Sequence, residues 1–388
     1  MKFNVAIIGG GAAGLACASR LSESCKNLKI AVIEAGERAG KKLAATGNGQ
    51  GNLTNVNMSA EHYFGGNLPL VEKLACGKDN YFIESSLFKC VLSHDELGRV
   101  YPGGRQASAL VDSLLADLKR GGVTLITGVK VEKLSRGFVL SLSDGRRVEA
   151  DFVVLCTGGK AQKQFKTDGS AYSLATGLGH SLTPLYPSLV QLKTDTQYIK
   201  TLKGIRVDCI VSAYCGGEKI AQKRGDVIFT EYGVSGNAIF AISPYIADKQ
   251  SVTLSLQFLP QESASVADDI KRKKKLGYPD SELLSGTLHN QLGRAIIKRA
   301  ESSDEKVIQN LVCNFTLSVT GSLGFDYAQV TKGGIKTSEV SDCLESKLVK
   351  NLFFAGEILD VDGECGGYNL HWAFSSACAV ADEISKRI

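Results

Sequence analysis

The fold is decided by the stretch VAIIGGGAAG at residues 5–14. Its first four residues form an apolar run without polar alternation, which is typical of a parallel strand buried on both faces. The glycines that follow have the GxGxxG spacing and begin a segment that predicts a helix to about Ser24. A second apolar run at residues 29–33 ends at Glu34, 20 residues after the last glycine of the motif. Strand, helix, strand and acidic residue in this order are typical of a dinucleotide-binding βαβ unit.

Each glycine of the motif has its own purpose in such a unit. The first allows the tight turn after the strand, the second lets a pyrophosphate approach the backbone, and the third lets the helix pack closely on the sheet. The free N–H groups at the start of the helix attract phosphates, and the acid can accept hydrogen bonds from a ribose. The motif leaves NAD and FAD both open. The residues expected to contact the dinucleotide here are Gly9, Gly11, Ala12, Ala13, Gly14, Glu34 and Ala35.

Composition describes a globular protein. The 388 residues, 44% of them hydrophobic, leave room for one large core or two to three domains. The net charge of +5 is too small an excess to indicate a nucleic-acid partner, and none is expected. Eleven cysteines without a CxxC pair are typical of reduced thiols in a cytoplasmic protein, and no zinc-ligand spacing is present, so no metal is expected. No run reaches the roughly 18 apolar residues that a membrane span needs.

The first half of the chain predicts further sheet structure after the βαβ unit. The polar, glycine-rich connection at residues 35–55 is typical of a functional loop. A buried strand is expected at residues 151–156, ending in Thr157-Gly158-Gly159, where it rejoins the parallel sheet. A β-meander is expected before it, with strands near 123–127, 129–134, 137–142 and 146–149.

The second half predicts inserted structure followed by a return to the sheet. Residues 190–255 predict β structure, and residues 258–312 predict helices, one of them from Glu282 to Ala300. The sheet pattern resumes at residues 351–357. The stretch GECGGYNLHWAF at residues 363–374 then begins a last helix that is expected to reach about Ile388. Glycines at a helix start allow close approach to a ligand, and the first N–H groups of the helix have no internal partner, so a ligand is expected to dock there.

Long motifs in a fixed order resemble a known family, the BaiN-like (YhiN-like) NAD(P)/FAD-dependent oxidoreductases, which are related to the two-dinucleotide-binding-domain flavoproteins. The resemblance covers nearly the whole chain. Two departures are Gln50-Gly51, where the family usually has Arg-Cys, and Asn237, where it usually has proline. The resemblance is carried by GxGxxG with Glu34, Gly40–Leu43, Thr46–Gly49, Asn52–Asn55, Phe229–Thr230, Gly233–Gly236, Val330–Gly334, Phe354–Glu357, Asp360–Gly363 and Gly366–Asn369.

The resemblance implies an α/β fold in three parts. Residues 1–190 and 320–388 would form a Rossmann-like FAD-binding domain with a β-meander. Residues 191–257 and 313–319 would form an inserted β-barrel-like domain, and residues 258–312 a small helical domain. FAD is therefore the expected cofactor.

The last helix is the expected electrostatic partner of the flavin ring. The N–H groups around Tyr368 and Asn369 would stabilise the negative charge of the reduced flavin, and Gly366 and Gly367 would permit the approach. The resemblance places Gly356 and Glu357 along the ribityl and phosphate portion, Thr157, Gly158 and Gly159 near the adenosine, and Val131 near the adenine. It also implies cofactor contacts at Lys42, Leu43, Thr46, Gly47 and Asn52, and a substrate pocket that includes Asn48, Tyr232, Ser235 and Asn237.

The sequence leaves the reaction open among three hypotheses. There is no second GxGxxG unit, and no cysteines lie four residues apart as a redox pair, so NAD(P)H, if used, would visit the flavin transiently. The first hypothesis is a reductase of an activated C=C in a small molecule, and the second is an oxidase of a small amine that forms hydrogen peroxide. The third is an RNA-modifying or RNA-binding flavoprotein that uses the basic run KRKKK at residues 271–275, although such runs are usually solvated helix faces. The five scattered histidines identify no catalytic residue, and the oligomeric state stays open.

Overall fold

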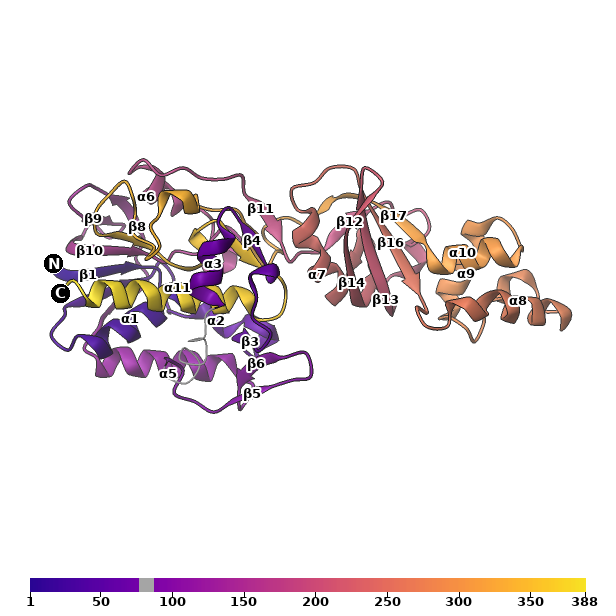
Figure 1. The fold of residues 1–388 in the computed structure, drawn as a ribbon, viewed down its shortest axis with the longest axis horizontal. Coiled ribbons are helices and arrows are strands. Elements are labelled where there is room, and N and C mark those ends of the chain that lie inside the picture. The colour runs from indigo at the N-terminus through magenta and orange to yellow at the C-terminus, as the bar shows by residue number, and fades with distance from the viewer. Residues whose placement is uncertain (77–86) are drawn as a thin grey trace. The chain divides into compact units, whose positions relative to one another are not determined.

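The chain folds into two compact units in the computed structural model, which describes residues 1–76 and 87–388. The first unit contains Met1–Tyr186 and Val330–Ile388, and the second contains Pro187–Gln329 (Figure 1). The first unit is therefore built from both ends of the chain, and the second is inserted between them.

A seven-stranded sheet forms the centre of the first unit, in the order β7-β2-β1-β10-β9-β8, with β19 also paired to β10. The strands β1, β2, β7 and β19 run parallel to their partners, whereas β9 and β8 form an antiparallel extension. Their bounds are β1 (Lys2–Ile8), β2 (Ile30–Ile33), β7 (Thr124–Ile126), β8 (Val131–Leu134), β9 (Val139–Leu142), β10 (Arg147–Leu155) and β19 (Leu352–Phe354). β2 and β19 are buried throughout and β1 along most of its length, as their apolar runs predict, whereas β7 at the edge of the sheet exposes Thr124 and Leu125.

The meander expected from the sequence is wrong at both of its ends. The segment at 123–127 forms β7, which pairs parallel with β2 at the edge of the sheet and is no part of the meander. The two strands expected at 146–149 and 151–156 are one continuous strand, β10. Its first half alternates exposed and buried residues against β9, and its second half is buried on both faces between β1 and β19. The change of pattern within one strand explains the error.

The first and last helices of the chain pack side by side on this sheet (Figure 1). Helix α1 (Ala12–Ser24) follows β1, and α11 (Tyr368–Ser385) ends the chain. Arg20 on α1 and Asp382 on α11 form a bidentate ion pair, with distances of 2.8 and 3.2 Å. The other helices of this unit are α2 (Lys41–Ala44), α3 (Leu68–Ala75), α5 (Ala107–Arg120) and α6 (Tyr172–Thr176).

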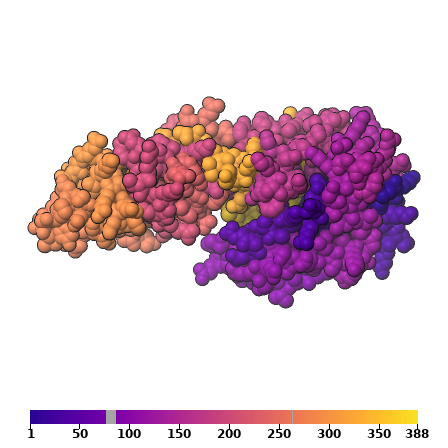
Figure 2. Space-filling view, turned by 180° about the vertical axis from the view of Figure 1, so that it is seen from behind, coloured from indigo at the N-terminus to yellow at the C-terminus, as the bar shows by residue number. Residues whose placement is uncertain are grey.

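Short strands join early and late segments of the first unit. Strand β4 (Tyr63–Gly65) pairs antiparallel with β20 (Val361–Gly363), so the start and the end of the chain meet again beside α11. Indigo and yellow segments accordingly interleave on the surface of this unit in Figure 2. The remaining short strands are β3 (Thr54–Asn55), β5 (Leu92–His94), β6 (Arg99–Pro102) and β18 (Val330–Lys332), and β11 (Tyr186–Ser188) lies at the boundary between the units.

The second unit is a closed six-stranded barrel with helices appended. The strand order is β12-β15-β14-β13-β16-β17. The strands are β12 (Leu192–Thr194), β13 (Arg206–Cys215), β14 (Glu218–Phe229), β15 (Gly233–Ser235), β16 (Val252–Phe258) and β17 (Phe315–Ser322). Three helices lie in the chain between β16 and β17: α8 (Val266–Lys275), α9 (Asn290–Ala300) and α10 (Glu305–Cys313).

The helix boundaries in the second unit differ from those expected. Residues 190–255 include the helix α7 (Asn237–Ile246), which buries Ala238, Ile239 and Ile242 at helical spacing. The β-rich surroundings and the internal Pro244 hid this short helix from sequence reasoning. The helix expected from Glu282 begins only at Asn290, because a 3-10 turn and a loop precede it.

The basic run at 271–275 is exposed at Lys271, Arg272 and Lys275, as expected of a solvated helix face, whereas Lys273 in its middle is buried. The Lys273 ammonium donates to Asp269 Oδ2 at 2.6 Å, to Thr287 Oγ1 at 2.9 Å and to the carbonyl of Ser285 at 2.8 Å. Burial alone would raise the pKa of Asp269, but the hydrogen bonds from Lys273 and Thr287 outweigh it and lower the pKa to about 2. Lys273 therefore holds α8 against the loop before α9.

Most of the charge of this run is balanced by acids. Arg272 lies 2.6 Å from Asp269, and Lys274 lies 3.4 Å from Glu305 on α10. Lys271 lies 3.6 Å from Asp268.

In the part of the chain that the structure describes, no helix is both long enough and apolar enough to cross a membrane.

Candidate functional site

The glycine motif forms a tight turn whose middle is open. Gly9 has φ +103°, and a Cβ there would lie 2.4 Å from the carbonyl oxygen of Cys156. A Cβ on Gly14 would lie 1.8 Å from the carbonyl oxygen of Gly9, so α1 packs directly on the turn. A Cβ on Gly11 would meet nothing within 4 Å. The open position lies at the start of α1, where Gly11 precedes Ala12 and Ala13 and no side chain caps the helix.

Glu34 holds this turn together. Its Oε2 accepts a hydrogen bond from the Gly10 N–H at 2.7 Å, and its Oε1 accepts one from the Gly36 N–H at 2.6 Å. The acid at the end of β2 therefore joins the glycine turn to the next loop, which contains Ala35. Each carboxylate oxygen keeps a second lone pair with which it can accept a ribose hydroxyl.

A polar cluster lies beyond the carboxyl ends of β10 and β19. Lys42 Nζ lies 3.0 Å from Glu357 Oε2, and Glu357 Oε1 accepts from the Thr331 N–H at 2.9 Å. Thr331 Oγ1 in turn accepts from the N–H groups of Lys160 and Ala161 at 2.8 and 3.0 Å. The structure thus brings the expected residues Lys42 and Glu357 together, beside the loop that contains Gly158 and Gly159.

Gly356 connects this cluster to both long helices. It has φ +77°, and a Cβ there would lie 3.0 Å from the Cβ of Ala13. Its N–H donates to Ser376 Oγ at 2.9 Å, and its carbonyl accepts from Trp372 Nε1 at 3.2 Å. The turn after β19 therefore lies against the first turn of α1 and the first half of α11.

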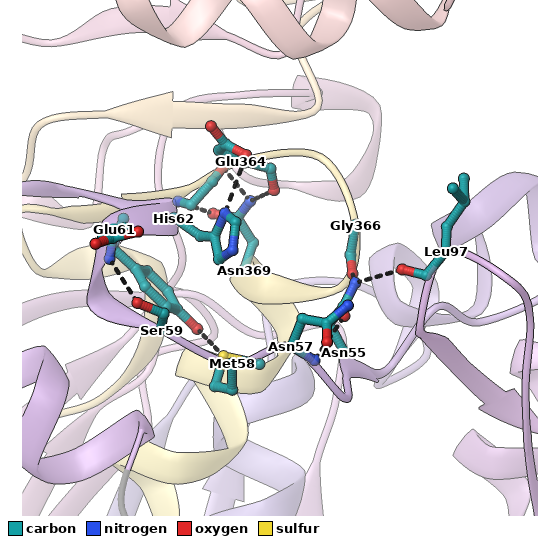
Figure 3. A network of polar contacts seen from close by, with 12 residues as sticks. Asn55, Asn57, Met58, Ser59, Glu61, His62, Leu97, Glu364, Gly366 and Asn369 are labelled. Carbon is teal, nitrogen blue, oxygen red and sulfur yellow. Dashed lines mark hydrogen bonds and ion pairs between the residues drawn. The ribbon is translucent and has the colours of Figure 1, made fainter. Parts of the chain in front are cut away.

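Glycines also crowd the start of α11. Gly367 has φ +102°, and a Cβ there would lie 2.4 Å from the carbonyl oxygen of Thr54. The Asn52 amide can accept from the Gly367 N–H at 3.1 Å and donate to the Thr54 carbonyl at 3.2 Å. Asn55 Nδ2 donates to the Gly366 carbonyl at 3.0 Å (Figure 3). Both positions favour glycine because of their positive φ, and Gly367 also has close backbone contacts, whereas a Cβ on Gly366 would lie 3.1 Å from the Tyr368 ring.

The first N–H groups of α11 are available to a ligand. The Asn369 side chain is occupied, since it accepts from the Gly363 N–H at 2.8 Å and donates to the Gly363 carbonyl at 2.7 Å. Within residues 1–76 and 87–388, the backbone N–H groups of Tyr368 and Asn369 have no hydrogen-bond partner. These groups carry the positive end of the helix dipole.

The loop expected beside the flavin has a left-handed backbone. Gly47 and Asn48 have φ of 56° and 54°, and Gly51 has φ of 76°. A Cβ on Gly51 would lie 3.0 Å from the Cβ of Ala107, so glycine suits this position better than the family's cysteine. The Asn48 side chain is exposed. Thr46 Oγ1 donates to the carbonyl of the buried Leu43 at 2.7 Å, which closes the loop on α2.

Two buried hydroxyls indicate that a ligand belongs in this unit. Thr157 Oγ1 and Tyr172 Oη are buried, and neither has a hydrogen-bond partner among the described residues. Burial raises the pKa of Tyr172, and the nearby charges of Glu357 and Asp360 add to the effect. Buried polar groups are nearly always hydrogen-bonded, so these orphaned atoms fit a polar cofactor. Sequence reasoning missed Tyr172, since nothing in its local sequence indicates a site.

Other expected residues belong to other elements of the fold. Val131 is buried at the start of β8, in the antiparallel extension of the sheet. Tyr232, Ser235 and Asn237 belong to the second unit, where Gly233–Ser235 forms β15 and Asn237 begins α7. Asn237 is exposed, and its backbone N–H donates to Asp226 Oδ1 at 3.3 Å.

Two of the five histidines, His371 and His180, have structural roles. His371 on α11 is buried, with Nδ1 2.7 Å from Thr54 Oγ1 and Nε2 2.7 Å from the Ala75 carbonyl. Burial lowers its pKa to about 4, although the hydrogen bond to Ala75 opposes this shift. His180 likewise bonds through both ring nitrogens, to Glu339 and Ser346. In the described ranges, no group of three or more His, Cys, Asp or Glu residues could hold a metal ion.

Comparison with known proteins identifies a family and several relatives of this chain. Residues 3–383 match the family described as HI0933-like protein Rossmann domain. A Clostridium scindens protein named 3-dehydro-bile acid delta(4,6)-reductase is 36% identical in an alignment of 399 positions that covers 96% of each chain. A Haemophilus influenzae protein named ribosomal RNA dihydrouridine synthase is 29% identical in an alignment of 406 positions that covers 98% of each chain.

A solved structure shares the fold. The 3-ketosteroid delta1-dehydrogenase from Sterolibacterium denitrificans aligns over 100% of both chains, with a TM-score of 0.51 and 13% identity. The predicted α/β class, a Rossmann-type FAD-binding fold with a barrel, is confirmed. The resemblance to the BaiN-like oxidoreductases is also confirmed. The chain belongs to the HI0933-like Rossmann family and is a flavin-dependent oxidoreductase.

Proposed function

We propose that this protein is an FAD-dependent reductase that passes hydride through flavin N5 to an activated C=C of a small organic molecule. NAD(P)H would supply the electrons by visiting the flavin transiently. The observation that carries the proposal is the start of α11, where two crowded glycines precede the unpartnered N–H groups of Tyr368 and Asn369. The name of the 36% identical relative, a reductase of a bile acid, supports a C=C as the electron acceptor.

The first unit would hold FAD along one line from α1 to α11. The pyrophosphate would lie at Gly11, where the backbone is open, and Glu34 would accept the ribose hydroxyls. Thr157 and Tyr172 would donate their orphaned hydroxyls to the cofactor. Residues 1–190 and 320–388 would be the FAD-binding domain.

Reduced FAD would supply two electrons as a hydride from N5. The protein's part is electrostatic: the N–H groups of Tyr368 and Asn369 would face the negative charge of the reduced ring. Donors fixed in advance at such a charge need no reorganisation during the reaction. Gly366 and Gly367 would keep side chains out of the way of the ring.

Anaerobic half-reactions test this proposal. NADPH or NADH should bleach the flavin, and a 4-ene-3-ketosteroid should then restore the oxidised spectrum in the absence of oxygen. Bleaching that no C=C substrate reverses would contradict the reductase assignment. Peroxide formed from a small amine, with no need for a nicotinamide, would favour the oxidase instead.

An RNA substrate is a second candidate, because the 29% identical relative is named a ribosomal RNA dihydrouridine synthase. A uracil ring also contains a C=C conjugated to a carbonyl, so the reaction class would be the same. The basic run at 271–275 gives this candidate little support, since its central lysine is buried and its neighbours are paired with acids. Reoxidation of the reduced protein by an unmodified ribosomal RNA fragment, and not by the steroid enone, would establish it.

A further inference from the structure

His62 lies at the N-terminal end of α11, called the mouth of α11 below, and two contacts hold it there. It ends the 3-10 turn Ala60–His62, directly before β4. Its ring stacks on the ring of Tyr368, with centroids 4.4 Å apart and an interplanar angle of 24°. Its Nδ1 lies 3.2 Å from Glu364 Oε2 (Figure 3). The Glu364 N–H also donates to the His62 carbonyl at 2.9 Å, so backbone and side chain together fix the pair.

The Glu364 carboxylate determines which ring nitrogen stays open. The Glu364 side chain is only 10% exposed, so its charge needs a donor, and the His62 Nδ1–H provides one. A neutral ring with its proton on Nδ1 leaves a lone pair on Nε2. Within residues 1–76 and 87–388, Nε2 has no hydrogen-bond partner, and the His62 side chain is 32% exposed. A ligand at the mouth of α11 can therefore reach this atom.

This arrangement differs from those of the two buried histidines. His371 and His180 have both ring nitrogens bonded within the protein, as structural histidines do. His62 has a buried carboxylate on one nitrogen and an open second nitrogen, which is the arrangement of an oriented acid or base. Burial, with a smaller contribution from Glu364, raises the pKa of Tyr368 to about 12, so the neighbouring phenol stays protonated.

The charged surroundings of His62 are acidic. The turn that contains His62 packs against α3, where Glu72 Oε2 accepts from the Ala60 N–H at 3.2 Å. The titratable groups that face or flank the ring from these elements are Glu61, Tyr63, Glu72, Glu364 and Tyr368.

We propose that His62, positioned by Glu364, supplies the proton that accompanies hydride transfer in this enzyme. The inference rests on the proposed C=C reduction. Hydride leaves flavin N5 for one carbon of the C=C, and the π electron pair takes the proton from His62 Nε2 at the other carbon. The flavin is oxidised, the C=C is reduced to CH–CH, and His62 becomes neutral with its Nδ1–H still on Glu364. Solvent restores the proton through the exposed edge of the ring.

The first test needs no turnover. Imidazole ¹⁵N NMR of the FAD-loaded protein should show neutral His62 as the Nδ1–H tautomer, and Glu364→Gln should change the tautomer ratio. His94→Gln is the matched control, because His94 is exposed on β5 and touches none of these residues. A dominant Nε2–H tautomer, or a His62 resonance that is insensitive to Glu364→Gln, would overturn the positioning role.

The second test isolates proton delivery. Dithionite-reduced protein is mixed anaerobically with a 4-ene-3-ketosteroid, and the rate of flavin reoxidation is followed against pH. We expect His62→Gln to slow this step about 100-fold and to remove its decline at high pH, while FAD affinity stays unchanged. A normal rate in His62→Gln, or a slow rate with the wild-type pH profile, would refute the role of His62. If wild-type protein does not react with the enone, the proposed reductase function fails, and the NMR result alone decides whether the pair is formed.

Discussion

Lys42 and Glu357 are 315 residues apart in sequence, yet Lys42 Nζ lies 3.0 Å from Glu357 Oε2. Both side chains are about one-fifth exposed, at 21% and 20%. The pair ties α2 to the turn after β19, and the second oxygen of Glu357 accepts from the Thr331 backbone. The candidate site therefore depends on contacts between the two ends of the chain.

Glu357→Gln should weaken FAD binding about tenfold, which corresponds to about 1.4 kcal/mol. The amide can still accept from Thr331, but it leaves the charge of Lys42 unbalanced beside the cofactor. Quenching of flavin fluorescence on binding measures the change. Lys41→Met on the same short helix is the control, since Lys41 is exposed. Equal FAD affinities for Glu357→Gln and wild type would remove this pair from the site.

Two glycine substitutions should separate cofactor binding from folding. Gly11→Ala should leave the unfolding temperature of the apoprotein within about 2 °C of wild type, because a Cβ there meets nothing within 4 Å. It should nevertheless weaken FAD binding strongly, since the Cβ would occupy the place of the pyrophosphate. Gly14→Ala should instead destabilise the apoprotein by about 3 kcal/mol, because its Cβ would lie 1.8 Å from the Gly9 carbonyl oxygen. Thermal unfolding with and without FAD checks both, and tight FAD binding by Gly11→Ala would be inconsistent with the proposed site.

Buried His371 should make stability depend on pH. Its pKa is about 4 in the folded chain against an ordinary value of 6.5, so the unfolded chain binds the proton first. Its contribution is complete above pH 6.5 and declines as the pH falls towards 4, by about 3 kcal/mol in all. His371→Gln should be less stable at neutral pH and should lose less stability between pH 6.5 and 4. Urea unfolding at several pH values tests this, and parallel curves for the two proteins would disprove it.

Lys273 should matter for stability, whereas its neighbour Lys275 should not. Lys273→Met removes the buried ammonium that joins the partly buried Asp269 to the loop before α9, which should destabilise the second unit by about 3 kcal/mol. Lys275→Met, on the exposed side of the same helix, should unfold like wild type. Calorimetry distinguishes them, and equal unfolding temperatures would show that the network around Asp269 is dispensable.

Sequence reasoning succeeded where one local pattern determines the structure. Residues 5–34 combine a buried strand, a glycine motif, a helix and a terminal acid, so β1, α1 and β2 could be predicted closely. It failed where tertiary context decides. The pairing of β7 with β2 and the continuity of β10 depend on neighbours more than 80 residues away in the chain.

The same limit applies to the candidate site. Family motifs placed Lys42 and Glu357 at the cofactor site, but no local sequence pattern predicts the ion pair between them. His62 and Glu364 are 302 residues apart, and Tyr172 lies in an unremarkable short helix. Residues that become neighbours only through the pairing of β4 with β20 leave no signal in a single sequence.

The crystal structure of the FAD complex tests the central claim most directly, because that claim is that α1 and α11 hold one FAD between them. The pyrophosphate should lie at Gly11, and the N1 and C2-carbonyl edge of the ring should accept hydrogen bonds from the N–H groups of Tyr368 and Asn369. A flavin ring bound away from the start of α11, or a pyrophosphate away from the start of α1, would contradict it.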